Sequence, residues 1–175
     1  MLLNKKFICG LFLAAGVSAQ ASADWNAGIA YSHFQDDEDE IDISLDGVTL
    51  SVGYEFVVED SKFSFMPELR LGFGVGDDNI SEFETNISVE IETYYGFTAR
   101  GTYHASPNFY IFLQPSYVNL EVKASSMGMS ATEDDWETGF GGGVGFVPMD
   151  NFMVEAIFED FDGTNAISAG IRYSF

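Results

Sequence analysis

The chain has 175 residues, of which 28 are acidic and only seven are lysine or arginine, so its formal net charge is −21. A surface this acidic repels nucleic acid, which we exclude as a partner. Cysteine occurs once, at Cys9, which excludes a disulfide framework. The aromatic content of 15% argues against a disordered chain.

The first 23 residues have the composition of a secretory signal peptide. Two lysines, Lys5 and Lys6, precede a short apolar run over residues 7–17, and small residues end the segment at Ala23. The apolar run is shorter than the roughly 20 residues that a transmembrane helix needs. We therefore expect residues 1–23 to be cleaved and residues 24–175 to form a single domain without cysteine.

Alternation with a period of two residues dominates the remaining sequence. In residues 46–56, apolar and aromatic residues occupy every second position, and small or polar residues lie between them. The same pattern predicts eight strands: Trp25–Phe34, Asp46–Phe56, Phe63–Val75, Asn86–Gly101, Asn108–Val122, Trp136–Val147, Phe152–Asp160 and Ala166–Phe175. Each is close to the roughly 9 to 11 residues of a tilted membrane strand, or longer.

The connections between these strands alternate in character. Three of them, at residues 57–62, 102–107 and 148–151, are short turns. The other four, at residues 35–45, 76–85, 123–135 and 161–165, are mostly longer and polar. Outer-membrane barrels have short periplasmic turns and longer outer loops, so the alternation predicts which end of the barrel is which.

A soluble β-sandwich also alternates apolar and polar positions, and the second face of each strand decides between the two architectures. Here that face consists mainly of glycine, serine, threonine and a few charges, which suits the narrow polar interior of a small barrel. The sequence therefore predicts an all-β fold: an eight-stranded antiparallel transmembrane β-barrel.

All three arginines, Arg70, Arg100 and Arg172, fall on this small and polar face. An arginine facing lipid near the midplane would cost about 2 to 4 kcal/mol, so we place them in the lumen. We predict a charge network that plugs the lumen, in which these arginines pair with Glu55, Glu68, Glu92 and Glu155. Glu90 and Glu159 share the face, and the alternation leaves open whether they lie in the lumen or hydrated above the membrane.

An acidic cluster fills the first expected outer loop, at Asp36, Asp37, Glu38, Asp39 and Glu40. It lacks the regular 12-residue ligand loop with a central glycine that binds calcium, so we predict no metal site. A hydrated acidic loop is the favoured interpretation. Divalent ions that bridge these acids to lipopolysaccharide phosphates are the alternative.

Catalysis finds little support in the sequence. His33 and His104 are the only bases that titrate near neutrality. Ser32 precedes His33, but adjacent strand residues point to opposite faces and cannot act as nucleophile and base. The lipid A deacylase barrels carry a His-x-Ser arrangement, whereas here Gln35 follows at that spacing. We predict no enzyme and no cofactor.

Two stretches carry a resemblance to a known family. Residues 139–146, rich in glycine and leading through Asp150 and Asn151 into the next strand, form the first. The ending Gly170-Ile171-Arg172-Tyr173-Ser174-Phe175 is the second. The chain resembles the outer-membrane-protein β-barrel domain family, the small barrels of OmpA and OmpX type. Its ending is similar to the carboxy-terminal signal read by the barrel-assembly machinery, carried here by Ile171, Tyr173 and Phe175.

The resemblance implies a location in the cell outer membrane, among lipid and lipopolysaccharide. It also implies a broad set of roles: envelope integrity, adhesion to a host surface or matrix ligand, or a narrow channel. Our first hypothesis is a structural or surface-interaction barrel with a plugged lumen. The second is a small cation-favouring pore, since lumenal glutamates would outnumber arginines. The third, a lipid A-modifying hydrolase, would depend on His33.

Overall fold

The computed structural model describes residues 23–36, 43–76, 78–82, 85–126 and 129–175. The expected signal peptide, apart from Ala23, and most of the first acidic loop, at residues 37–42, lie outside these ranges. Within them, no helix is long and apolar enough to cross a membrane.

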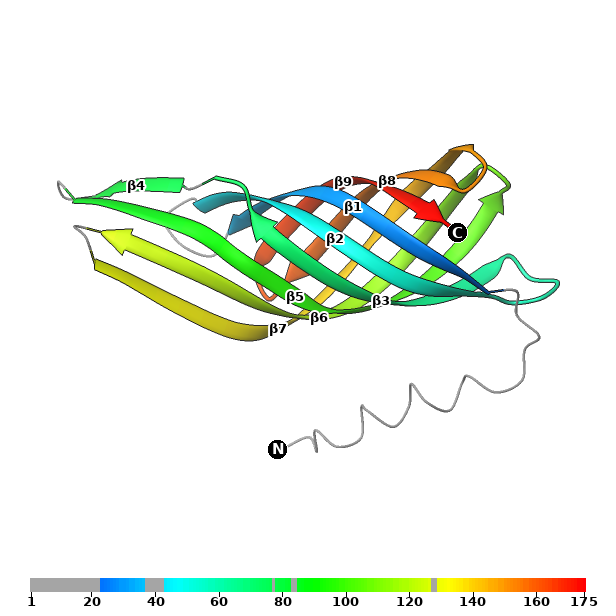
Figure 1. The fold of residues 1–175 in the computed structure, drawn as a ribbon, viewed down its shortest axis with the longest axis horizontal. Coiled ribbons are helices and arrows are strands. Elements are labelled where there is room, and N and C mark those ends of the chain that lie inside the picture. The colour runs from blue at the N-terminus through cyan, green and yellow to red at the C-terminus, as the bar shows by residue number, and fades with distance from the viewer. Residues whose placement is uncertain (1–22, 37–42, 77, 83–84, 127–128) are drawn as a thin grey trace, which may run out of the picture.

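The described residues form nine antiparallel strands, and eight of them close into a ring (Figure 1). Their bounds are β1 Ala23–Asp36, β2 Ile43–Val57, β3 Phe63–Gly74, β4 Asp78–Glu82, β5 Thr85–Ser106, β6 Phe109–Ser126, β7 Met129–Met149, β8 Phe152–Phe161 and β9 Thr164–Ser174. Strands that follow each other in sequence pair, except that β3 pairs with β5 and not with β4, and β9 pairs with β1. This ring confirms the predicted eight-stranded barrel, with β4 as an additional short strand beside β5.

Side chains alternate between the two sides of the wall as the period of a strand requires. Along β3, exposed and buried residues follow each other almost without interruption from Phe63 to Phe73. Large apolar residues such as Leu69 and Leu113 are 52% and 60% exposed, whereas Arg100 and Gln114 are almost fully buried. The wall therefore has an apolar outside and a largely polar inside.

Aromatic side chains gather at the two edges of the apolar outer band. At one edge, Trp136 stacks on Tyr117 with 4.7 Å between ring centroids, and Tyr95 packs edge-on against it at 5.6 Å. At the other, Trp25 and Phe56 pack edge-on against Tyr54. Two aromatic girdles around an apolar band are typical of a barrel that crosses a bilayer.

Three consecutive strands extend well beyond the rest of the barrel. β5, β6 and β7 have 22, 18 and 21 residues, against 10 in β8 and 11 in β9. Their outer ends, together with β4, form a sheet that projects past the ring (Figure 1). Residues 123–135, expected as a loop, are therefore mostly strand, and residues 76–85 contain β4. The polar, turn-like composition of these residues did not predict strands. They form strands because they pair with each other beyond the ring.

The strict alternation predicted for residues 86–101 fails at Glu92. In the pairing with β6, Ile91 lies opposite Val122 and Thr93 opposite Glu121, so Glu92 is the extra residue of a β-bulge. The bulge reverses which side chains face inward. Val89 and Ile91, expected on the outer wall, are buried inside.

Apolar side chains also pack inside the lumen, in two clusters. The outer cluster comprises Phe34, Leu45, Val89, Ile91, Tyr94, Val118, Phe161 and Ala166. The cluster nearer the short turns comprises Tyr110, Phe112 and Ile157. The interior is therefore less uniformly polar than the sequence predicted, because one apolar cluster lies outside the charges and the other lies among them, with Ile157 between Glu155 and Glu159 on β8.

The outer wall gives a direct test of membrane insertion. Leu113→Arg, midway between the two girdles, should lower the free energy of unfolding from lipid vesicles by about 2 to 4 kcal/mol. Val75→Arg, at the outer rim, should cost about 0 to 1 kcal/mol. Urea titration followed by tryptophan fluorescence measures both, and equal costs at the two depths would contradict a bilayer-spanning wall.

Candidate functional sites in the lumen and at the outer rim

The centre of the lumen holds a group of paired charges from strands on opposite sides of the barrel. Arg70 on β3 reaches across to Glu159 on β8, with its Nη1 2.9 and 2.7 Å from the two carboxylate oxygens. Its Nε donates to Glu68, on its own strand, at 3.1 Å. Ser116 on β6 donates a further hydrogen bond to Glu159 at 3.3 Å.

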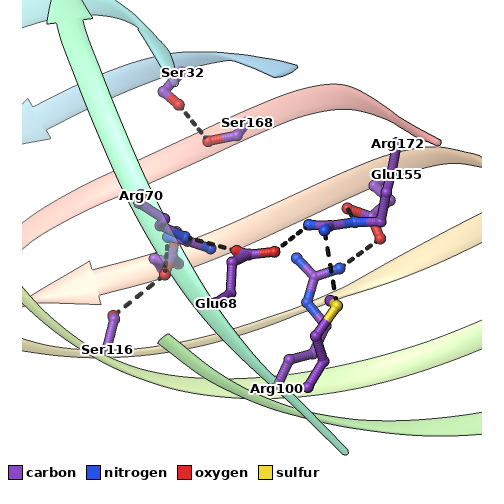
Figure 2. Close-up of polar contacts among 10 residues, drawn as sticks. Ser32, Glu68, Arg70, Arg100, Ser116, Glu155, Ser168 and Arg172 are labelled. Atoms are coloured by element: carbon purple, nitrogen blue, oxygen red, sulfur yellow. Dashed lines mark hydrogen bonds and ion pairs between the residues drawn. The ribbon is translucent and has the colours of Figure 1, made fainter. Parts of the chain in front are cut away.

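Glu68 and Glu155 link this pair to the other two arginines (Figure 2). Arg172 on β9 forms an ion pair with Glu68 Oε2 and lies 3.5 Å from Glu155 Oε2. Arg100 on β5 donates from Nη1 to Glu155 Oε1 at 2.6 Å. Three arginines and three glutamates thus form one buried cluster, which we call the lumenal charge cluster: Arg70, Arg100, Arg172, Glu68, Glu155 and Glu159.

Neighbouring rings fix the ends of this cluster. The Tyr110 hydroxyl donates to Glu155 Oε1 at 2.7 Å, and the guanidinium of Arg100 lies 4.0 Å from the centre of the Phe112 ring. Glycines make room for such rings, because a Cβ at Gly145 would lie 2.0 Å from Tyr110. The large inward side chains therefore fit only because glycines lie beside them on the neighbouring strand.

The space that remains around the charges is small. Lumenal residues, including Ser32, Thr49, Arg70, Tyr94 and Glu159, line a cavity of about 40 Å³. One water needs roughly 10 to 15 Å³ measured in this way, so the cavity holds only a few waters.

Two residues that the sequence placed in the charge network lie elsewhere. The expectation for Glu92 is wrong: the β-bulge turns it away from the lumen, and its carboxylate lies 3.2 Å from Lys123 on the projecting sheet. Glu55 lies nearer the short turns, where Ser64 donates to it at 2.6 Å and His104 is 3.7 Å away.

The sequence left open the places of Glu90, which pairs with Lys123 outside the charge cluster, and of Glu159. The structure puts Glu159 in the middle of the lumenal charge cluster, opposite Arg70. Its neighbour Asp160, like Glu159, is acidic, and only the register of β8 against β9 decides which of the two faces inward.

A second polar group lies on the outside of the barrel, above the apolar band. His33 on β1 lies directly opposite Asp46 on β2, and its Nδ1 is 2.8 Å from the Asp46 carboxylate. Ser44 Oγ lies 3.4 Å from the other ring nitrogen, Nε2. Hydrogen bonds from His33, and then from Tyr31, hold the pKa of Asp46 below its usual value. We call these three residues the rim triad: Ser44, His33 and Asp46.

The projecting sheet is strongly acidic. Glu133, Asp134 and Asp135 are exposed on β7. Lys123 on β6 lies 3.0 and 3.2 Å from Glu90 and Glu92. Hydrogen bonds to these two glutamates raise the pKa of Lys123, so its charge is already engaged.

The remaining predicted site residues are placed more simply. Asp36 ends β1, and the rest of the acidic loop lies outside the described residues. Ile171, Tyr173 and Phe175 are exposed on the outer wall, and the Phe175 amide donates to the Trp25 carbonyl at 2.9 Å. Among the residues that the structure describes, no group of three potential metal ligands comes together.

A closed ring of eight antiparallel strands with an apolar outside and charges inside defines a small outer-membrane β-barrel. The chain matches the outer membrane protein beta-barrel domain family over residues 7–175 and belongs to it. It is a protein of the outer membrane. Comparison with curated protein sequences gave no match.

Solved structures with the same fold include two bacterial surface proteins. The attachment invasion locus protein Ail of Yersinia pestis is 19% identical, with a TM-score of 0.60, and the match covers 89% of this chain and 99% of Ail. Neisserial surface protein A is 12% identical, with a TM-score of 0.62, over 88% of this chain and 99% of that one.

A third solved structure of this fold is the N-terminal barrel of Pseudomonas aeruginosa OprF. It is 13% identical, with a TM-score of 0.56, and the match covers 85% of this chain and 97% of that one. Identities this low show the fold alone.

Removing one arginine should leave a buried carboxylate without its shortest ion pair. Arg100→Met should therefore lower the free energy of unfolding by about 3 to 5 kcal/mol, the usual cost of breaking a buried pair. Lys123→Met, which removes a half-buried cation of the projecting sheet, is the matched control and should leave the urea midpoint nearly unchanged. Equal midpoints for the wild-type protein and Arg100→Met would show that the cluster does not stabilise the barrel.

Proposed function

We propose that the protein acts at the cell surface as a structural and interaction barrel and not as a channel. The observation that carries this proposal is the division of the molecule into two parts. One part is a barrel whose interior is filled with paired charges and apolar side chains. The other is an acidic sheet that projects beyond the ring.

Paired charges support a closed lumen in two ways. Arg70 and Glu159 span the interior from opposite walls, so an ion passing through would have to break their contact. Moreover, the outer apolar cluster, which includes Phe34 and Phe161, lies beyond them and offers an ion no polar partner. The three arginines of the cluster balance its three glutamates, so the cluster itself presents no excess of negative charge to a cation.

The projecting sheet supports the interaction role because it adds surface that the barrel does not need for closure. Residues 129–138 of β7 pair with β6 but not with β8, whose partners begin at Gly139. About ten residues of strand correspond to roughly 30 Å of extended chain. The acidic residues 133–135 lie just beyond Trp136 on this sheet, so it carries them past the outer aromatic girdle.

Charge decides which class of partner this surface favours. Ail was also solved in complex with the heparin analogue sucrose octasulfate, a dense polyanion. This chain carries a net charge of −21 and exposes Glu133, Asp134 and Asp135 on its projection. Like charges repel at a binding surface, so we propose a cationic partner, such as a basic segment of a host surface or matrix protein.

Export and assembly complete the proposal. Residues 1–23 act as a cleaved signal peptide, and the mass of the protein recovered from outer membranes tests this. Ile171, Tyr173 and Phe175 present an apolar edge to the barrel-assembly machinery. The mature barrel then lies among outer-membrane lipid and lipopolysaccharide.

A closed lumen makes a clear electrical prediction. The wild-type protein, inserted in a planar bilayer, should show no steady conductance, because paired charges and the outer apolar cluster occupy the interior. Glu68→Ala together with Glu159→Ala should produce measurable openings by removing two of its three carboxylates. A stable cation-selective conductance in the wild-type protein would instead establish the pore.

The acidic surface predicts salt-dependent binding of cations. Immobilised polylysine should retain cells that display the wild-type barrel, whereas immobilised heparin should not. Replacing Glu133, Asp134 and Asp135 by lysine should weaken polylysine binding at least about tenfold at low salt and should have little effect near 1 M salt. The same number of lysines at Glu59, Asp60 and Asp150, near the short turns, is the matched control. Strong heparin binding by the wild-type protein would overturn the charge argument.

A further inference from the structure

The rim triad has the arrangement of a hydrolytic triad. The Asp46 carboxylate can only accept a hydrogen bond, so the proton of the neutral His33 ring lies on Nδ1, 2.8 Å from Asp46. Nε2 is then an acceptor and faces Ser44 Oγ at 3.4 Å. An acid that orients an imidazole, which in turn faces a hydroxyl, is the relation by which a serine nucleophile is activated.

Strand register brings these residues to one face. His33 lies opposite Asp46, and Gln35 lies opposite Ser44, so all four side chains belong to the outer side of the β1–β2 pair. Tyr31, two residues before His33, also hydrogen-bonds to Asp46 and fixes the carboxylate from below. Gln35 therefore contributes an amide beside Ser44, and an amide N–H is the kind of donor that stabilises an oxyanion.

A groove on the outer wall lies directly below the triad. It has a volume of about 390 Å³ and is lined by Ile29, Tyr31, Val48, Val154, Ala169 and Ile171. Tyr31 lies opposite Val48 on one side and opposite Ala169 on the other, so its small neighbour Ala169 creates the hollow. This row is two residues below His33 and Asp46, or about 7 Å along the strand.

The position of the groove determines what occupies it. Its lining belongs to the exposed apolar band that faces the hydrocarbon of the bilayer, where the available ligand is an acyl chain. The ester of a membrane lipid lies where hydrocarbon meets headgroup, which is the level just above this band. An acyl chain in the groove thus brings its ester to the height of Ser44.

We propose that the rim triad is the catalytic site of an acyl-ester hydrolase that acts on lipids of the outer leaflet. Ser44 is the nucleophile, His33 the general base and acid, and Asp46 orients the ring. The groove holds the acyl chain, and Gln35 donates to the oxyanion. This site is on the outer wall, so it does not depend on a closed lumen or on the acidic projection.

The reaction uses only lipid and water. Ser44 Oγ attacks the ester carbonyl carbon while its proton passes to His33 Nε2. The tetrahedral intermediate collapses, the bond to the lipid alcohol breaks, and the alcohol leaves with that proton. Water then attacks the acyl-serine, gives a proton to His33, and releases the fatty acid as Ser44 recovers its hydroxyl proton.

Release of fatty acid from vesicles tests the proposal. The full-length barrel is incorporated into vesicles of phosphatidylethanolamine and phosphatidylglycerol in one arm, and into vesicles containing lipid A in the other. Mass spectrometry then measures free fatty acid. Ser44→Ala and His33→Ala should each reduce release by about a hundredfold or more. The arm in which release occurs identifies the lipid class.

Matched variants separate chemistry from folding. Ser130→Ala makes the same change on the exposed outer part of β7 and should retain full activity. Ala169→Phe fills the groove and should reduce release at least about tenfold, whereas Ala99→Phe adds the same ring elsewhere on the wall. A heat-dependent gel shift shows that each variant is folded.

Covalent labelling tests whether Ser44 is a nucleophile, because a serine with a merely structural role would not react. A long-chain fluorophosphonate should label Ser44 in the wild-type protein, and labelling should fall in His33→Ala and vanish in Ser44→Ala. A folded wild-type barrel that neither labels at Ser44 nor releases more fatty acid than Ser44→Ala in either arm would overturn the proposal.

Discussion

Backbone hydrogen bonding in a medium without water is the constraint on which this structure depends. Lipid offers no partner to an N–H or C=O group, so a sheet that crosses a bilayer must have no free edge. Pairing of β9 with β1 and of β3 with β5 satisfies that demand within the ring. Closure in turn creates a narrow interior, in which the size and charge of each inward side chain limit which side chains fit beside it. The unpaired edges of β4 and β7 lie beyond the ring, where the chain has extended past it.

The sequence predicted the wall of the barrel well. The alternation of apolar and polar residues within each strand indicates which side chains face outward, without reference to any other strand. Each of Arg70, Arg100 and Arg172 could be placed inside from its own strand, since the cost of exposing a guanidinium to lipid is a local property. Their partners could not be chosen in this way. Arg70 and Glu159 are separated by 89 positions and meet only because the ring brings β3 opposite β8.

Two kinds of information were missing from the sequence, and both concern register. A single extra residue, Glu92, reverses the facing of the outer part of β5, and nothing in the alternation of the residues before it marks the bulge. The rim triad was missed for a related reason. Along its own strand, His33 has only Ser32 and Gln35 as neighbours, whereas the hydroxyl that faces its ring is that of Ser44, brought close by the pairing of β1 with β2.

The bulge at Glu92 affects both the lumen of the barrel and the projecting sheet. By turning Val89 and Ile91 inward it supplies two members of the outer apolar cluster, which covers the charge cluster from the outside of the cell. By turning Glu92 outward it places a carboxylate beside Lys123 on the projecting sheet. One inserted residue therefore both adds apolar side chains to the outer end of the lumen and adds charge to the projection. Glu92 is next to Thr93, the last residue of β5 that pairs with β3, so the bulge and the local bend that such bulges cause lie where β5 leaves the ring.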